Sequence, residues 1–225
     1  MNTTIISLPR TASSFVIRHY AKIHNLVSYD ELFKSYNIHK LNDFCSTDAC
    51  IAKLQPLDYF DHNEKYNIDN ILSNNKILII KPPTYLECYT SFIISVAMTN
   101  RDTTGETGKY WNLKLINKSV NAVLTPTDFY AQLKKPVTRE ESFDHIRYYT
   151  RHVNAFIRLN TIVKFLSNNI KIITPSMISS FDPSKASKLS KDLSQKTDLI
   201  DDWPEVKKEI EIAAHSQWEK INESL

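Results

Sequence analysis

The hydrophobic positions of the chain form short continuous runs that alternate with helical spacings. Residues 5–8 form an apolar run typical of a buried strand, and apolar positions from 15 to 26 then recur every three or four residues, which predicts an amphipathic helix. The same succession returns later. Residues 76–80 form a β-branched run typical of a parallel strand covered on both faces, and a helical pattern follows over 86–97.

Strand and helix patterns also alternate in the C-terminal half of the chain. Thr138 and Glu141 form a capping-box pattern that predicts the start of the longest helix, whose apolar face extends to about residue 163. Residues 170–173 predict a further strand, and an amphipathic helix is expected after Trp203. Because strands alternate with helices, the sequence predicts an α/β fold, namely a three-layer α/β/α sandwich with a central parallel sheet.

The remaining segments are less regular. Residues 38–75 favour short helices interrupted at Pro56, the last of them near 68–72. Residues 100–109 contain both glycines of the chain and no large apolar residue, which predicts a mobile loop, and residues 179–198 form a polar segment rich in Ser, Lys and Asp. We expect a single domain over 1–225, since this length does not require two.

Composition narrows the possible partners. A net charge of +3 suits an anionic ligand and is too weak to argue for nucleic acid. Three cysteines cannot all pair, and they lack the spacing of a zinc site, so we expect reduced thiols. The sequence has no signal-peptide pattern and no apolar run of membrane-spanning length, so we expect a cytoplasmic protein without a membrane partner.

The tight polar turn at residues 9–14 is the strongest candidate for a binding site. A strand that enters a helix through such a turn directs backbone N–H groups and the positive end of the helix dipole toward one point, which favours phosphate. Arg10 adds a permanent charge, while Thr11, Ser13 and Ser14 add hydroxyl donors. The alternative is an ordinary turn in which Ser13 or Ser14 only caps the helix.

The pattern P-R-x-x-S-S-aromatic in this turn resembles the phosphate-binding loop of sulfotransferases that use 3′-phosphoadenosine 5′-phosphosulfate (PAPS). Ala12 stands where that family usually has glycine. The resemblance implies a P-loop-like sulfotransferase fold of the bacterial or phage type. It also implies that Arg10 to Phe15, including Ala12, hold the 5′-phosphosulfate of PAPS.

A second segment resembles another signature of the same family, an arginine and proline followed by a serine on the next helix. Here Lys81 stands for the arginine, and Ser91 or its neighbour Thr90 stands for the serine. The resemblance implies that these residues hold the 3′-phosphate. The alternative is a solvated lysine and a serine bonded within its own helix.

Glu31 is the candidate base. Together with Ser28 it fits a capping box, which would make it structural. The resemblance instead implies that Glu31, within Asp30–Phe33, accepts the proton of the attacking hydroxyl, with His24 and His39 as alternatives.

The resemblance as a whole implies a transferase that moves a sulfuryl group from PAPS to a hydroxyl of a carbohydrate or small metabolite. No metal is expected, since no carboxylate cluster follows the turn. Two alternatives stay open. One is a phosphoryl transferase of the P-loop class, although the Walker lysine and glycines are missing. The other is a nucleotide-binding protein without activity.

Overall fold

The computed structural model describes residues 1–11, 13–29, 31–34, 37–100, 135–174, 177 and 197–225, with the backbone alone at 15 and 98–100. Nearly all of the loop predicted at 100–109 and of the polar segment at 179–198 lies outside these residues.

The chain divides into two compact units, each described separately below. The first comprises Met1–Pro83, Arg151–Asp182 and Ser216–Leu225, and the second comprises Thr84–Thr150 and Pro183–His215. The single domain over 1–225 stays a prediction.

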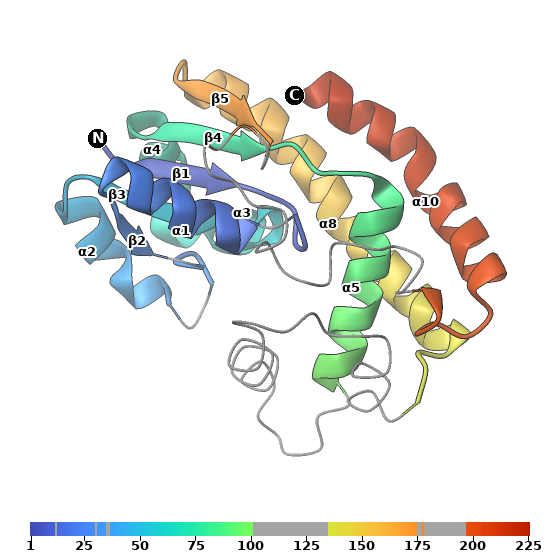
Figure 1. Cartoon of the computed structure of the whole chain (residues 1–225). Helices are drawn as coiled ribbons and strands as arrows, with labels where there is room; N and C mark the ends of the chain where they lie inside the picture. The colour runs from blue at the N-terminus through green and yellow to red at the C-terminus, as the bar shows by residue number, and fades with distance from the viewer. Residues whose placement is uncertain (12, 30, 35–36, 101–134, 175–176, 178–196) are drawn as a thin grey trace. The chain divides into compact units, whose positions relative to one another are not determined.

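The first unit contains a sheet of five parallel strands in the part of the chain that the structure describes. The strands are β1 (Thr3–Ile6), β2 (Val27–Tyr29), β3 (Cys50–Leu54), β4 (Lys76–Ile80) and β5 (Ile170–Ile173). They lie in the order β2-β3-β1-β4-β5, and every neighbouring pair is parallel (Figure 1). The predicted α/β class with a central parallel sheet is therefore confirmed.

Strands β4 and β5 coincide with the predicted runs at 76–80 and 170–173, whereas β1 ends two residues earlier than predicted. The prediction of short helices before Pro56 is wrong for β3. Ile51 and Leu54 are three residues apart, as in a helix, but all five residues of β3 are buried in the sheet. Pro56 begins the next helix, where its missing N–H costs no hydrogen bond.

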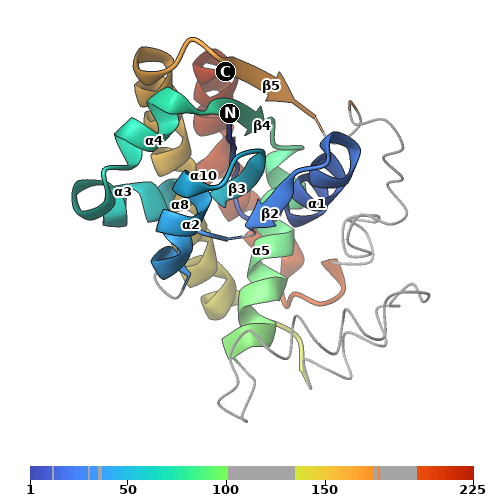
Figure 2. The same cartoon turned by 90° about the vertical axis from the view of Figure 1, so that its left-hand side faces the viewer.

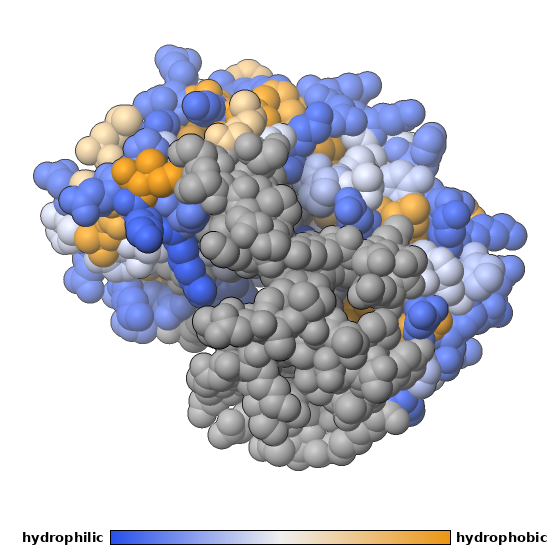
Figure 3. All heavy atoms as spheres, in the orientation of Figure 1, coloured by the Kyte–Doolittle hydropathy of each residue, from blue (hydrophilic) through white to orange (hydrophobic). Residues whose placement is uncertain are grey.

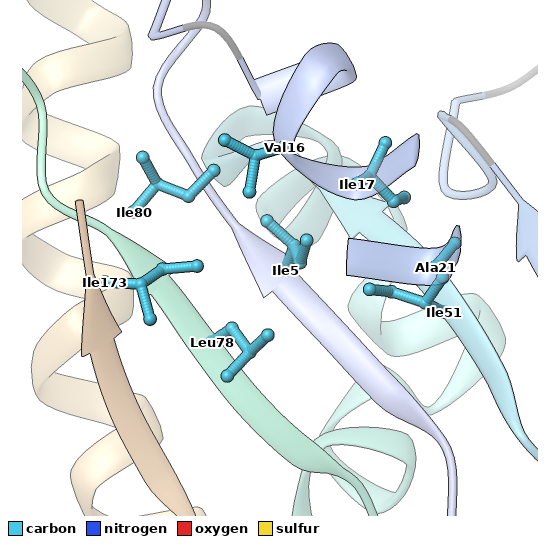
Figure 4. Close-up of a cluster of buried hydrophobic side chains, with 8 residues drawn as sticks. All are labelled: Ile5, Val16, Ile17, Ala21, Ile51, Leu78, Ile80 and Ile173. Carbon is cyan, nitrogen blue, oxygen red and sulfur yellow. The ribbon is translucent and has the colours of Figure 1, made fainter. Parts of the chain in front are cut away.

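Helix α1 (Ser13–His24) covers one face of the sheet. Ile5, Ile51 and Leu78 point from three adjacent strands toward this helix and are fully buried (Figure 4). Val16, Ile17 and Ala21 of α1 close the cluster, with Ile80 and Ile173 beside them. Each buried branched side chain contributes about 2 kcal/mol. This core fixes the N-terminus of α1 over the carboxyl ends of the strands.

Helices α3 (Pro56–Tyr66) and α4 (Ile68–Asn74) cover the opposite face. The connection from β1 to β2 runs toward one edge of the sheet, and that from β3 to β4 runs toward the other. Because such crossovers are right-handed, their helices must lie on opposite faces, as Figures 1 and 2 show. Arg158 of α8 (Arg139–Leu166) stacks over the Phe60 ring of α3 at 4.6 Å. Helices on both faces are what a three-layer sandwich requires.

Two short elements follow β2, namely the 3-10 turn η1 (Ile38–Lys40) and helix α2 (Leu41–Ser46). Phe44 of α2 is fully buried and its ring meets that of Phe33 edge-on. On the face drawn in Figure 3, the described surface is mainly hydrophilic, with separate hydrophobic patches.

The second unit contains α5 (Tyr85–Asn100), the first part of α8 and the first part of α10 (Trp203–Ser224). The predicted capping box is confirmed, because Thr138 N donates to Glu141 Oε2 at 2.9 Å and Glu141 N donates to Thr138 Oγ1 at 3.3 Å. Thr84 and Glu87 form the same motif before α5, so that helix begins after the prolines. The three cysteines, Cys45, Cys50 and Cys88, are free thiols, as predicted.

Candidate functional site

The parallel sheet brings three separate turns of the chain to one edge. Strands β2, β3 and β1 are neighbours, so the segments that follow them leave the sheet side by side. In open α/β sheets, ligands bind at this carboxyl edge, where successive connections depart to opposite faces. Here the connection after β1 enters α1 and the connection after β3 enters α3, on opposite faces.

At this edge, Lys53 contacts residues from two of these turns. It lies opposite Ile5 in the sheet and, two residues after Ile51, points toward the same face as α1. The residue is 2% exposed, although lysine is seldom buried without a partner. Its Nζ donates to Ser14 Oγ at 3.2 Å and to Glu31 Oε1 at 3.0 Å. Lys53 thus joins the first turn of α1 to the turn after β2.

Glu31 has ammonium groups on both carboxylate oxygens. Oε1 accepts from Lys53, and Oε2 lies 3.1 Å from Nζ of Lys34. Its backbone is left-handed, with φ 55°, which is uncommon for a residue with a side chain. The capping box predicted for Ser28 and Glu31 is wrong, because Ser28 lies within β2 and Glu31 lies in the turn after it. Its role as a base stays a prediction.

The turn between β1 and α1 has the form that the sequence predicts. Arg10 is left-handed, with φ 68°, and Ser13 and Ser14 are the first residues of α1. Thr11 is buried, and its hydroxyl donates to Leu8 O at 2.8 Å, so that proton stabilises the turn itself. Ser14 is the hydroxyl that meets Lys53.

Two candidates of this turn fall outside the described residues: Ala12 entirely, and the side chain of Phe15. The backbone of Phe15 belongs to α1. The proposed contribution of these two positions stays a prediction.

The candidate residues for the 3′-phosphate belong to different units. Lys81 follows β4 in the first unit, with an exposed side chain and a backbone N–H that donates to Ile173 O at 2.9 Å. Ser91 and Thr90 lie in α5 of the second unit and are both buried.

The alternative histidines have other positions. His24 is in the last turn of α1 and its ring contacts Tyr20, with centroids 4.2 Å apart. Eleven residues of helix separate it from Ser13, which corresponds to roughly 16 Å. His39 is exposed in η1. Among the three candidate bases, Glu31 is therefore the one that contacts Lys53.

Two further titratable groups feel the charge of Lys34. Burial raises the pKa of Asp58, in the first turn of α3, to about 6, while Lys34 and His62 lower it and Glu31 and Asp61 raise it. Burial, together with the positive charges of Lys34 and Arg151, lowers the pKa of His152 to about 4. Shifted pKa values of this kind are common at functional sites.

Sequence reasoning missed Lys53. A single lysine within the apolar run C-I-A-K-L is the signal that could have identified it, since a charge inside a buried strand needs a partner. Its partners depend on the sheet register, which the sequence pattern does not give.

Comparison of the chain with protein-family models, with curated proteins and with solved structures found no match. No helix among the described residues is both long and apolar enough to cross a membrane. Within the same residues, no group of three or more His, Cys, Asp or Glu side chains is arranged to hold a metal ion.

Proposed function

We propose that the chain binds PAPS with its phosphosulfate at the N-terminus of α1 and transfers the sulfuryl group to a hydroxyl of a carbohydrate or small metabolite. The observation that carries this proposal is the buried ammonium of Lys53, 3.2 Å from Ser14 at the start of α1 and 3.0 Å from Glu31. A cation, a helix N-terminus and a carboxylate are the three groups that transfer from an anionic donor needs.

The donor set suits an anion with several oxygens. Lys53, Arg10, the Ser14 hydroxyl and the first N–H groups of α1 are all groups with hydrogen-bond donor capacity. The left-handed backbone of Arg10 supports the proposal further, because a left-handed residue in a tight loop directs successive N–H groups toward one anion. As part of the same proposal, the fold is the P-loop-like fold of the resembling family.

Each residue has one task in the proposed reaction. When bound, PAPS supplies a sulfur whose bond to the bridging phosphate oxygen breaks as the acceptor oxygen bonds to it. Glu31 takes the proton of the acceptor hydroxyl on a carboxylate oxygen. Lys53 and the N–H groups of α1 stabilise the negative charge on the departing phosphate. Lys81 and Ser91, or Thr90 in its place, are the proposed contacts of the 3′-phosphate.

A second candidate function is nucleotide binding without transfer. The observation that favours it is that both oxygens of Glu31 contact ammonium groups, which compete with a proton. Incubation with radiolabelled PAPS and a panel of sugars and hydroxyl metabolites separates the two candidates: turnover supports transfer, and binding without turnover supports the second.

The test of the cofactor is calorimetric titration with 3′-phosphoadenosine 5′-phosphate (PAP), and separately with ATP and magnesium. We expect micromolar binding of PAP, about −8 kcal/mol, and its loss in Arg10→Ala. The matched control is Lys22→Ala, which removes a positive charge from the other end of α1. Binding of ATP with magnesium in preference to PAP supports a phosphoryl transferase, and binding of neither contradicts the proposal.

A further inference from the structure

Lys53 is held in a way that a bound anion must disturb. With 2% of the residue exposed, its ammonium is reached only if one of its contacts gives way. Ser14 belongs to the helix anchored on the core of the first unit through Val16 and Ile17. Glu31 belongs to a turn, and its side chain is 28% exposed. Ser14 and Glu31 are both partly exposed, so the difference between them is that Glu31 lies in a turn whereas Ser14 lies in a helix packed on the core.

The carboxylate of Glu31 also has the chemistry of a ligand. It is an anion, it accepts from Lys53 at 3.0 Å, and it lies beside the Ser14 hydroxyl that shares this ammonium. A phosphate or sulfate oxygen would accept from the same ammonium, with the Ser14 hydroxyl as a further donor 3.2 Å from it. Two anions cannot both occupy one ammonium at close range without mutual repulsion.

We infer that Glu31 is an internal competitor for the anion site: in the ligand-free protein its carboxylate occupies the position on Lys53 that the phosphosulfate of the donor takes over. The inference rests on the proposed function for the identity of the donor, but the competition itself requires only an anion. Lys34 retains Glu31 Oε2 during the exchange, so the carboxylate moves away from Lys53 without losing every cationic contact.

The exchange has a consequence for the order of events. Before the donor binds, both oxygens of Glu31 contact ammonium groups, and a proton from the acceptor competes with them. Once the donor anion takes Lys53, Oε1 no longer accepts from that ammonium, and the proton of the acceptor loses this competitor. Glu31 therefore acts as a base only after donor binding.

A double-mutant cycle tests the competition. Calorimetric titrations with PAP and with inorganic pyrophosphate are made on the wild type, Glu31→Gln, Lys53→Met and the double variant. We expect Glu31→Gln to tighten anion binding at least fivefold and Lys53→Met to weaken it at least tenfold. In the Lys53→Met background, Glu31→Gln should have no effect, because the competition is for Lys53. Glu64→Gln, which removes an exposed charge on α3, is the control and should change little.

Several results would overturn the inference. One is weaker or unchanged anion binding in Glu31→Gln. Another is an equal gain in affinity when Glu31→Gln is made in the Lys53→Met background. A third is an equal gain in Glu64→Gln, which would indicate that the net charge of the protein alone determines the affinity. If Glu31→Gln does not fold, Glu31→Asp takes its place. Its shorter side chain withdraws the carboxylate from Lys53, so we expect a smaller gain in anion affinity than for Glu31→Gln. Pyrophosphate binding with the expected cycle, but no PAP binding, would refute the proposed function and leave the competition standing. PAP binding that Glu31→Gln leaves unchanged would refute the competition and leave the proposed function standing. Binding of neither anion would refute both.

Discussion

The ion pair between Lys53 and Glu31 predicts an asymmetry between the two substitutions that break it. The Lys53 side chain is 3% exposed and the Glu31 side chain is 28% exposed. Breaking a buried pair is costly mainly because a charge stays behind without its partner. The cost therefore depends on which charge remains, and the buried one is the more expensive.

The expected magnitudes follow from this difference. Glu31→Gln leaves the ammonium of Lys53 buried, so we expect a loss of about 3 kcal/mol in the free energy of unfolding. Lys53→Met leaves a carboxylate that reaches water and still contacts Lys34, and Met fills the volume of the removed side chain. For this variant we expect a loss of about 1 kcal/mol, the range of a partly exposed pair. The double variant should resemble Lys53→Met.

The assay is urea unfolding at pH 7, followed by far-UV circular dichroism, with stability compared at equal m-value. A loss in Lys53→Met as large as that in Glu31→Gln would contradict this prediction, because the buried ammonium would then not be the costly charge. A double variant less stable than either single variant would refute it as well, since it would show that the two residues stabilise the fold independently.

Three further predictions concern stability. The pKa of Asp58 is about 6 in the folded protein and ordinarily 3.8, so the folded protein binds this proton more tightly. The free energy of unfolding therefore falls as the pH rises from about 4 to 6, and the loss is complete above pH 6. Asp58→Asn should therefore raise the free energy of unfolding by about 2 kcal/mol at pH 8 and change it little at pH 4; an equal effect at both would contradict the shift. Ala49→Gly should stabilise by about 0.5 kcal/mol, since Ala49 has φ 57°, whereas Ala213→Gly within α10 should destabilise by about 1 kcal/mol; thermal melts compare them. Thr138→Ala should cost about 1 kcal/mol in chemical unfolding by removing the cap of α8, and an unchanged midpoint would contradict that role.

Much of the fold could be predicted from local pattern. The run at 76–80 is a central strand of a sheet that has helices on both faces, so the side chains on both faces are buried and the apolar pattern is continuous. The start of α8 follows from Thr138 and Glu141, because a capping box needs only residues three apart. Strand β2 has three residues, mostly exposed, and gives no such pattern.

The candidate site was predictable only in separate parts. The turn at Arg10–Ser14 and the residue Glu31 could each be identified as candidates from sequence and resemblance, yet no local pattern indicated that Ser14 and Glu31 contact the same lysine. Lys53 links them because β3 lies between β1 and β2 and places Lys53 opposite Ile5. That register is set by pairing between distant segments, which no periodicity within β3 encodes.

We propose that an anionic nucleotide binds at the N-terminus of α1 through Lys53. The most direct measurement is an NMR titration with PAP that follows the amide signals of Thr11, Ser13 and Ser14 and the 13Cε signal of Lys53, assigned by its absence in Lys53→Met. We expect saturable micromolar shifts that are largest at these four positions. Shifts confined to other elements, or no shifts at millimolar PAP, would contradict it.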